Sequence, residues 1–324
     1  MKPPALDRRL SIAPMLDRTD RHCRYFLRLL SRHTLLYTEM VTTGPLLHGE
    51  HARFLRVDPA EHPLALQLGG SDPQAMAVCA HMGEEAGFDE IDMNLGCPSD
   101  RVQSGRFGAC LMAEPELVAN CILAMKKAVS IPVTVKTRIG IDERDSYQEL
   151  CTLVDTLAAA GCDALIVHAR KAWLHGLSPK ENRDIPPLRY EVVRHLKQDF
   201  PQLPIAINGG ITTLEQARSL LRDLDGVMIG RAAYRNPWIL AAADREIFGD
   251  THPIPSRRQV LEAYSIYLER ELAARVPLNA LTRHLFGLFQ GQPGARRWRR
   301  TIGTHTRRFG YDSRWLLEAA PPDL

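Results

Sequence analysis

Short apolar segments recur between residues 10 and 230, and each is followed by a stretch with helical periodicity. The short segments are interpreted as strands that are apolar on both faces, as a parallel sheet covered on both faces requires. Eight of them are found, at residues 10–15, 35–40, 64–68, 89–94, 132–137, 163–168, 204–208 and 225–230. Eight strands alternating with helices predict an α/β fold, a (β/α)8 TIM barrel, and a doubly wound open sheet is the structural alternative.

Two of the intervening helices carry clear end signals. Ser146 with Glu149 three residues later predicts a capping box, and Gly161 closes the helix that follows. Pro115 predicts the start of a second helix, whose apolar residues share one face and whose last turn is basic at 126–127. Helices bounded in this way are the elements that a barrel needs between its strands.

The alternation stops after residue 236, and the rest of the chain is helical in pattern. The predicted helices span residues 239–249, 256–274, 278–291 and 294–309. A linker rich in turn-forming residues lies at 250–256. We therefore predict a barrel domain at 1–245 and a small all-helical C-terminal domain at 246–324.

Composition narrows the class of protein. The 324 residues are 45% hydrophobic and 24% charged, as in ordinary globular proteins. No apolar run is long enough for a membrane span, and the first residues lack the apolar region of a signal peptide, so we expect a cytoplasmic protein. Seven cysteines without a C-x-x-C pair fit neither a disulfide framework nor a zinc site, so reduced thiols and no metal are expected.

The net charge of +3 is unevenly distributed. Residues 251–324 hold 12 arginines, no lysine and 6 acidic residues, a net +6, which leaves −3 for the first 250 residues. The segment "GARRWRR" (294–300) sets four arginines around Trp298, a composition suited to phosphate contact and base stacking. A solvated helix is the alternative, but the basic tail favours a nucleic-acid partner.

Polar or conformationally special residues stand at or near the C-terminal ends of the predicted strands, where barrel enzymes build their active sites. They are Met15, Gln67, Asn94, Lys136, His168, Asn208 and Gly230. Each has an ordinary explanation when taken alone. His168 fits a hydrogen-bonded structural histidine, Gln67 fits support of a loop, and Lys136 fits a lysine that reaches solvent at the barrel rim. Together they predict a site.

Glycines directly after the seventh and eighth strands predict a phosphate cradle, because backbone N–H groups and a helix N-terminus bind anions there. Its residues would be Asn208, Gly209, Gly210, Gly230 and Arg231. If the phosphorylated ligand is a flavin mononucleotide, the Lys136 ammonium would stabilise the anionic reduced ring. Gln67 would then bind the ring edge, and His168 the ring or the ribityl phosphate.

Cys97 lies in a glycine-rich loop three residues after Asn94, between Gly96 and Pro98. A free thiol has a pKa of about 8.5 and keeps its proton at neutral pH. The residues alone leave three roles open for it: a proton donor, a nucleophile or an inert thiol. No neighbouring histidine supports the nucleophile.

Several motifs resemble the tRNA-dihydrouridine synthases, specifically the DusA subfamily, in order from about residue 10 to residue 300. They include "APMLDRTDRHCRYF", "ALQLGG", "NLGCPSDRVQSGRFGACLM", "VTVKTRIG", "HARKAWLHGLSPKENRDIPPL", "INGGI", "GRAAYRNPW" and "GLFQGQPGARRWRR". The resemblance implies a flavoenzyme that passes hydride from NADPH to FMN and on to D-loop uridines 20 and 20a of tRNA, making 5,6-dihydrouridine.

The resemblance also implies roles for single residues. Cys97 resembles the family's proton donor and Asn94 the residue that contacts the target uridine. The implied FMN-binding residues are Pro14, Met15, Leu16, Gln67, Lys136, His168, Asn208, Gly209, Gly210, Gly230 and Arg231. The implied tRNA-binding residues are Lys180, Arg183, Arg296 and Arg299. Cys110 is expected to be a buried structural thiol, and Arg18 departs from the family, which commonly has tryptophan there.

Two rival functions are weighed against this one. A flavin-dependent reductase of free pyrimidines, such as a dihydroorotate or dihydropyrimidine dehydrogenase, would also use a phosphate cradle and a loop cysteine, but the basic tail argues against it. A non-catalytic RNA-binding barrel would have no need for the cofactor residues at the strand ends. The expected partners are tRNA and NADPH, with no membrane and no obligate protein partner.

Overall fold

The protein is described by a computed structural model at residues 6–305 and 314–321, and a parallel sheet forms the centre of this part of the chain. The sheet order is β1-β9-β8-β7-β6-β5-β4-β2, and β3 also pairs with β4. The strands are β1 (Leu10–Ile12), β2 (Leu36–Tyr37), β3 (Val41–Thr42), β4 (Leu64–Gly69), β5 (Glu90–Leu95), β6 (Val133–Arg138), β7 (Ala164–His168), β8 (Ile205–Asn208) and β9 (Gly226–Ile229).

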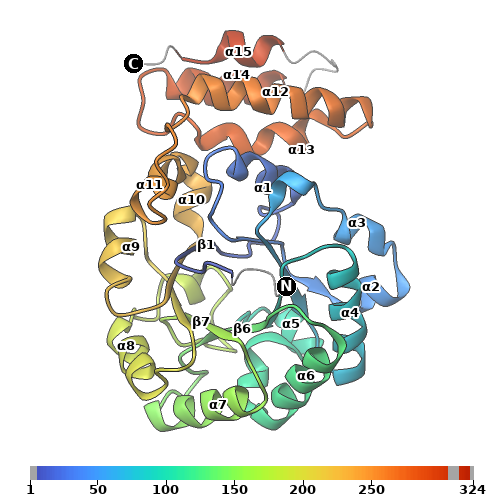
Figure 1. The fold of residues 1–324 in the computed structure, drawn as a ribbon, viewed down its shortest axis with the longest axis vertical. Coiled ribbons are helices and arrows are strands. Elements are labelled where there is room, and N and C mark those ends of the chain that lie inside the picture. Colours follow the sequence, from blue (N-terminus) through green and yellow to red (C-terminus); the bar gives the residue numbers. More distant parts are fainter. Residues whose placement is uncertain (1–5, 306–313, 322–324) are drawn as a thin grey trace.

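The sheet closes on itself between β1 and the chain entering β2. The Ile12 N–H donates to the Leu35 carbonyl at 2.9 Å, and the Leu35 N–H donates to the Leu10 carbonyl at 3.1 Å. With helices around the outside, this is the predicted (β/α)8 barrel (Figure 1). The structural alternative, a doubly wound open sheet, is therefore excluded.

The strand predicted at 35–40 contains only β2, because the extended segment is interrupted after Tyr37 and continues as β3 beyond the predicted range. The reason is that the Thr38 side chain takes a place in the ladder: its hydroxyl accepts the Gln67 N–H at 3.0 Å, while its own N–H donates to the Ala65 carbonyl at 3.0 Å. The strand ladder is thereby interrupted between the two short pieces.

Helices of the barrel follow the strands in sequence. They are α1 (Arg21–Arg28), α2 (Thr43–His48), α3 (His51–Leu55), α4 (Pro73–Glu85), α5 (Asp100–Ser104), α6 (Pro115–Ala128), α7 (Tyr147–Ala159), α8 (Tyr190–Asp199), α9 (Leu214–Leu220), α10 (Arg231–Arg235) and α11 (Ala243–Glu246). Short 3-10 helices are η1 (Pro59–Glu61), η2 (Gly108–Ala113), η3 (Glu181–Arg183), η4 (Pro237–Ala242) and η5 (Arg283–Gly287). None of the described helices is long and apolar enough to cross a membrane.

The predicted helix signals are largely confirmed. Helix α6 begins at Pro115, and Gly161 follows α7 with φ +89°. Ser146 caps α7 by accepting the Glu149 N–H, but the second bond of a capping box is absent between these two residues. The Glu149 carboxylate instead accepts a hydrogen bond from the Ser146 hydroxyl at 2.8 Å. The capping-box prediction is wrong in that half.

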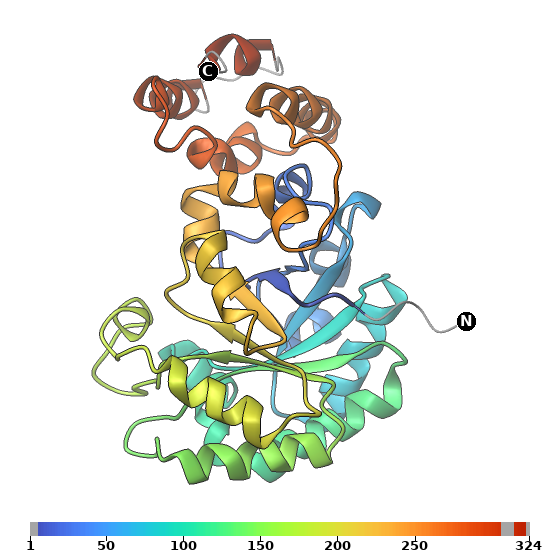
Figure 2. The ribbon, with the colours of Figure 1, turned by 60° about the vertical axis from the view of Figure 1, so that its left-hand side comes forward.

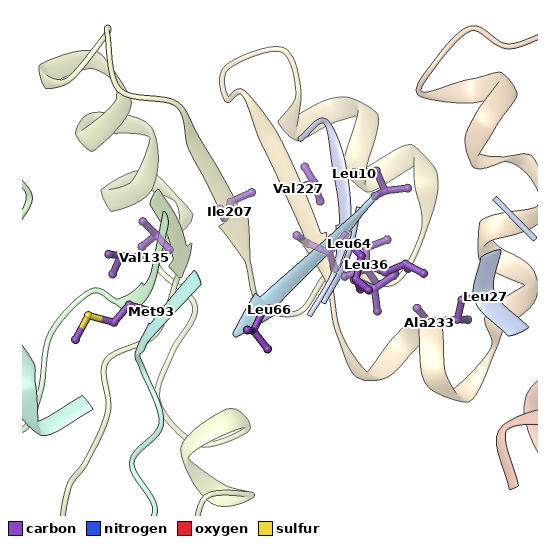
Figure 3. Packing of buried hydrophobic residues seen from close by; sticks show 14 of the residues in the cluster. Leu10, Leu27, Leu36, Leu64, Leu66, Met93, Val135, Ile207, Val227 and Ala233 are labelled. Atoms are coloured by element: carbon purple, nitrogen blue, oxygen red, sulfur yellow. The ribbon is translucent and has the colours of Figure 1, made fainter. Parts of the chain in front are cut away.

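The core has two parts because side chains of a strand alternate between its faces. Outward-facing residues such as Leu66, Met93 and Val135 pack beneath the helices (Figure 3). A second, small cluster fills the inside of the barrel. It consists of Ala13, Leu35, Tyr37, Ala65, Ile166, Ala206 and Met228. The inner positions beyond this cluster carry the polar side chains described below.

The C-terminal helices gather on one side of the barrel, next to α1 and α10 (Figures 1 and 2). They are α12 (Arg257–Ala273), α13 (Leu278–Thr282), α14 (Ala295–His305) and α15 (Arg314–Ala319). The helical pattern was predicted, but α15 was not, and residues 306–309 of the predicted last helix lie outside the described residues. The domain boundary at residue 245 stays a prediction.

Trp298 is the centre of this helical layer rather than part of its surface. It is fully buried, donates its indole N–H to the Leu285 carbonyl at 2.8 Å and packs its ring edge-on to Phe289. Ala295 and Ile302 are buried on the same face of α14, at helical spacing. The prediction that Trp298 stacks on a base is therefore wrong, because the apolar stripe of α14 faces inward while arginines such as Arg296 are exposed.

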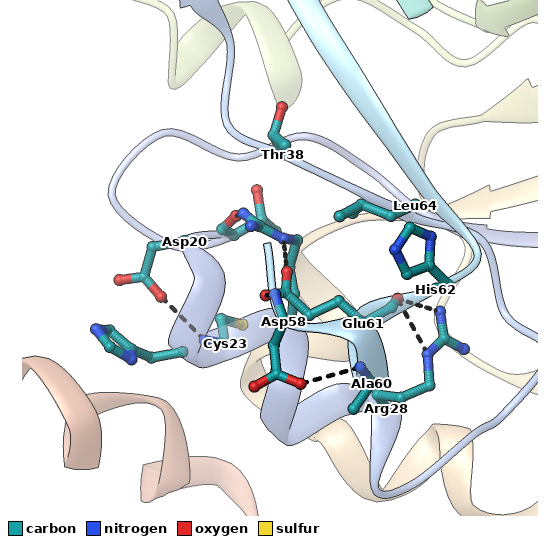
Figure 4. A network of polar contacts seen from close by, with 12 residues as sticks. Asp20, Cys23, Arg28, Thr38, Asp58, Ala60, Glu61, His62 and Leu64 are labelled. Carbon is teal, nitrogen blue, oxygen red and sulfur yellow. Dashed lines mark hydrogen bonds and ion pairs between the residues drawn. The ribbon is translucent and has the colours of Figure 1, made fainter. Parts of the chain in front are cut away.

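Helix α1 is fixed firmly where the helical layer meets the barrel (Figure 4). Asp20 caps it by accepting the Cys23 N–H at 2.9 Å. The buried Arg24 guanidinium pairs with Glu61 at 2.6 Å, and Arg28 donates to the Glu61 carbonyl at 2.9 Å. These contacts join α1 to η1. The loop between β1 and α1 is therefore anchored at its α1 end.

Candidate active site

The C-terminal ends of the central strands bring five of the predicted residues to one end of the barrel. Register pairs Asn94 on β5 with Lys136 on β6, and His168 on β7 with Asn208 on β8. Gln67 on β4 joins them through its side chain, whose Oε1 accepts a hydrogen bond from Asn94 Nδ2 at 2.9 Å. A continuous arc of polar side chains therefore lines the barrel mouth.

Lys136 lies half-buried in this arc. Its ammonium donates to Asn208 Oδ1 at 3.3 Å, and in the described chain it forms no ion pair with a carboxylate. Burial lowers the pKa of Lys136 to about 8, helped by nearby Arg138 and opposed by Asp92. A desolvated ammonium without a counter-ion is suited to binding an anionic group.

His168 is held in its neutral form. Burial and the charges of Arg138, Lys136, Arg170 and Arg231 keep the pKa of His168 well below its usual range. A neutral imidazole offers one N–H donor and one acceptor, so His168 can bind a polar ligand without adding charge.

Gly209 and Gly210 form a turn that no other residue type fits. Their φ angles are +118° and +71°, and a Cβ on Gly209 would lie 2.8 Å from the His168 ring. Neither N–H donates to another residue in the described part of the chain. Gly230 differs, because a Cβ there would meet only Ala13 at 3.6 Å. Free N–H groups in a turn without side chains make a fitting cradle for a phosphate.

Arg231 is already engaged in this structure. Its guanidinium donates to both Asp184 carboxylate oxygens, at 2.7 and 3.2 Å, and to the Arg183 carbonyl at 3.3 Å. Arg231, which was predicted to bind the phosphate, therefore also stabilises the loop after β7.

The predicted residues after β1 lie in the loop that leaves the barrel at its mouth. Pro14 and Met15 are half-buried, and the Met15 N–H donates to the Thr19 hydroxyl at 3.0 Å. Leu16 is 67% exposed, which is unusual for a large apolar side chain. The structure therefore places this loop at the mouth of the barrel.

The loop that carries Cys97 is fixed at both ends. Asn94 Oδ1 accepts the Gly96 N–H at 3.2 Å and the Cys97 N–H at 3.0 Å. The Cys97 carbonyl accepts the Ala109 N–H at 2.9 Å, and a Cβ on Gly108, whose φ is +77°, would lie 2.6 Å from that carbonyl oxygen. Gly96, by contrast, has room for a side chain, so the loop does not need a glycine there.

The two cysteines of this segment differ in their surroundings. The half-buried Cys97 thiol has one polar neighbour among the described residues, the Ser99 hydroxyl at 3.5 Å, and no basic group touches it. Cys110 was expected to be buried but is half-buried, and its thiol contacts the Phe107 carbonyl at 3.2 Å. Burial raises the pKa of Cys110.

The predicted tRNA-binding residues lie on two separate elements. Lys180 and Arg183 are exposed around η3, in the loop after β7. Arg296 is exposed on α14, and Arg299, half-exposed, donates to Gln290 at 3.1 Å. The charges of Arg231 and Arg18 are close enough to act on Arg183, so three guanidinium groups lie near one another at the mouth.

Sequence reasoning missed two residues of the site, Asp92 and Arg138. Arg138 is buried and donates to the carbonyls of Gly96 at 2.8 Å and of Lys171 and Asn182 at 3.0 Å. It therefore joins the Cys97 loop to the loop after β7. Burial lowers the pKa of Arg138 to about 10. Asp92 lies inside the predicted strand at 89–94 and Arg138 directly follows the one at 132–137, so a charged residue in or at the end of a strand was the signal that could have revealed both.

Comparison with known proteins supplies a family. Residues 11–312 match the family model described as dihydrouridine synthase. The tRNA-dihydrouridine(20/20a) synthase of Synechocystis is 59% identical over 97% of this chain and 92% of its own. Its counterpart in Shewanella oneidensis is 61% identical over 94% of this chain and 91% of its own, and that of Escherichia coli K12 is 60% identical over 96% and 90%.

Two solved structures share the barrel. A 2-naphthoyl-CoA reductase complex aligns with a TM-score of 0.57 at 12% identity, over 78% of this chain and 52% of that one. Morphinone reductase aligns with a TM-score of 0.53 at 14% identity, over 78% and 88%. At such low identity these likenesses support the fold alone.

Proposed function

This chain belongs to the dihydrouridine synthase family, and on that premise we propose that it reduces uridines 20 and 20a of tRNA to 5,6-dihydrouridine, with FMN as its flavin and NADPH as its reductant. The observation that carries the proposal is the combination, at one barrel mouth, of a side-chain-free phosphate cradle, a desolvated lysine and a loop thiol. Relatives about 60% identical over nearly the whole chain bear the name of this activity.

The residues at the mouth fit an FMN. The free N–H groups of Gly209 and Gly210, with Arg231, would hold its phosphate, and the Lys136 ammonium would compensate negative charge on the reduced ring. Neutral His168 would donate a hydrogen bond, and Pro14, Met15, Leu16, Asn208 and Gly230 would complete the walls. When bound, the flavin supplies hydride to C6 of the uracil ring.

Gln67 and Asn94 each have a defined donor left for a ligand. The Asn94 oxygen accepts two backbone N–H groups, and its Nδ2 donates one hydrogen to Gln67. One Nδ2 hydrogen therefore remains for the uridine. Gln67 uses its oxygen on Asn94 and one N–H on Asp92, so one Nε2 hydrogen remains for the flavin edge. Both side chains therefore meet their ligands as donors.

Cys97 would donate the proton that C5 of the uracil ring takes up after hydride reaches C6. A thiol still holds its proton at neutral pH, whereas a carboxylic acid with a pKa near about 4 would already have lost it. Among the described residues the thiol forms no hydrogen bond with a histidine, lysine or arginine that could take its proton as a base, although the charges of Lys136, Arg138 and Arg183 reach it. The lack of a neighbouring base, together with the resemblance to the family's proton donor, favours the acid among the three roles that the residues left open.

The target base must leave its stack to reach the mouth, which costs a few kcal/mol and requires the rest of the tRNA to be held. Lys180 and Arg183 would hold it beside the mouth, and Arg296 and Arg299 on α14. We place the protein in the cytoplasm, with tRNA and NADPH as its partners.

The proposal is tested by incubating the purified protein with FMN, NADPH and unmodified tRNA. We expect a yellow protein and a mass gain of two hydrogen atoms at uridines 20 and 20a, located by nuclease digestion and mass spectrometry. Reduction of free uracil or oxidation of dihydroorotate with unchanged tRNA would instead support the free-pyrimidine reductase. A protein that binds tRNA but cannot be loaded with FMN would support a non-catalytic barrel.

A further inference from the structure

Two carboxyl groups, Glu90 and Asp92, are fully buried inside the barrel on neighbouring inward positions of β5. Glu90 has a complete set of partners: the Arg8 guanidinium at 2.9 Å, the Tyr37 hydroxyl at 2.7 Å and the Thr134 hydroxyl at 2.9 Å. Asp92 forms no ion pair with any described cation. A buried carboxyl group without a counter-ion is costly, so a role is expected of it.

Asp92 instead ends a chain of hydrogen bonds that begins at Cys97. The Cys97 N–H donates to Asn94 Oδ1 at 3.0 Å. Asn94 Nδ2 donates to Gln67 Oε1 at 2.9 Å, and Gln67 Nε2 donates to Asp92 Oδ2 at 2.7 Å. Asn94 and Gln67 are buried along with Asp92, so water does not substitute readily for a lost partner.

The direction of this chain is dictated by its starting point. A backbone N–H can only donate, so Asn94 must turn its oxygen to the loop and its nitrogen to Gln67. Gln67 must then turn its oxygen to Asn94 and its nitrogen to residue 92. Residue 92 must therefore accept, and with no acceptor there the orientation of both amides would be lost.

We propose that Asp92 is a positioning residue: its Oδ2 atom is the terminal acceptor that orients the Gln67 and Asn94 amides and thereby holds the turn that carries Cys97. The inference deepens the proposed function, on which it rests for the chemical importance of Cys97. Asp92 lies three hydrogen bonds from the Cys97 backbone, through Gln67 and Asn94, and on this proposal it determines how accurately the Cys97 thiol is placed.

The role requires an acceptor and not a charge. The Thr134 hydroxyl lies 3.1 Å from Asp92 Oδ1 and 2.9 Å from Glu90, yet it has a single proton to donate. Glu90, paired with Arg8, is the better acceptor, so a proton on Asp92 Oδ1 satisfies the remaining contact. Burial correspondingly raises the pKa of Asp92 to about 7. Asparagine, with its oxygen toward Gln67 and its nitrogen toward Thr134, would reproduce this arrangement.

The test is the rate at which iodoacetamide alkylates Cys97 in the full chain, without added flavin or tRNA, measured by peptide mass spectrometry. Cys151, half-buried on α7, is the internal reference. In Asp92→Ala we expect Cys97 labelling to rise by about threefold or more relative to Cys151, because the loosened turn opens more often. In Asp92→Asn we expect it to stay within about twofold of the parent protein.

Thr134→Val is the matched control, because it disturbs the same buried cluster while leaving the chain from Asp92 Oδ2 to Cys97 complete. In this variant Cys97 should be alkylated at the same rate, relative to Cys151, as in the parent protein. If Asp92→Ala does not fold, Gln67→Met breaks the next link and should raise Cys97 labelling in the same way. Unchanged labelling in folded Asp92→Ala or Gln67→Met, or an equal rise in Asp92→Asn, would overturn the proposal.

This outcome is separable from that of the proposed function. The labelling uses no cofactor, substrate or turnover, so it reports the placement of Cys97 whether or not Cys97 is the acid. Failure of Cys97→Ala to impair dihydrouridine formation would instead reject the acid role and leave the labelling pattern unaffected.

Discussion

The two cationic regions of the molecule are built in opposite ways. At the barrel mouth, burial lowers the pKa values of Lys136 and Arg138, and both side chains are fixed by hydrogen bonds to named partners. On α14, arginines such as Arg296 extend into solvent around the buried Trp298. Desolvated cations stabilise negative charge at one defined point, whereas solvated ones attract phosphates generally and are screened by salt. The mouth should therefore determine the chemistry, and α14 the affinity for tRNA.

Cys97→Ala should have the largest effect. We expect dihydrouridine formation to fall by roughly 10²–10⁴-fold, the usual contribution of a general acid, while reduction of the flavin by NADPH is unchanged. The measurement is flavin reoxidation by tRNA together with nucleoside analysis. Cys110→Ala is the matched control and should stay active, because that thiol contacts only the Phe107 carbonyl among the polar groups described. An undiminished rate in Cys97→Ala would reject the acid.

Lys136→Met should have the next largest effect. In flavin-free protein it should change how the free energy of unfolding depends on pH. Burial lowers the pKa of Lys136 to about 8, below its value of 10.5 in an unfolded chain. Between these values the unfolded state binds the additional proton, so stability gains up to about 1.4 kcal/mol per pH unit as pH rises. Lys136→Met should lack this gain in chemical unfolding curves from pH 8 to 10. Parallel curves for the two proteins would show that the ammonium is not desolvated.

The pair Arg296→Ala and Arg299→Ala should weaken tRNA binding by about tenfold and reduce the slope of log affinity against log salt by about 1 to 2. Flavin content should not change, because neither side chain lies at the mouth. Arg218→Ala with Arg222→Ala is the control: these residues lie before β9, at the opposite end of the barrel, and should leave the slope alone. If the two α14 substitutions leave the salt slope unchanged, α14 is not part of the surface that binds tRNA.

Arg18→Ala should have the smallest effect. The Arg18 guanidinium lies 4.9 Å from the centre of the Tyr234 ring, a contact that contributes about 0.5–1 kcal/mol, and it adds positive charge beside Arg183. We expect slightly lower stability and a few-fold weaker tRNA binding, measured by thermal unfolding and filter binding. Tighter binding in the variant would show that Arg18 repels its neighbours more than it helps to hold tRNA.

The sequence predicted the barrel because eight short strand segments alternate with helical segments, a pattern that can be recognised without knowledge of any contact. It predicted which residues stand at strand ends for the same reason. It did not predict that Trp298 is buried, because the arginines on both sides of it make the segment strongly polar. The buried stripe consists of only three residues, Ala295, Trp298 and Ile302. Asp92 was missed because its importance lies in the partners of its two oxygens, which only the fold brings together.

The most direct test of the difference between the two regions is single-turnover reoxidation of the pre-reduced flavin by tRNA, at increasing tRNA concentration. For Arg296→Ala with Arg299→Ala, we predict that the rate at saturating tRNA equals that of the parent protein and only the half-saturating concentration rises. For Cys97→Ala, the rate should stay low at every concentration. A Cys97 variant that recovers at saturation, or an α14 variant that does not, would contradict the assignment of chemistry to the mouth and affinity to α14.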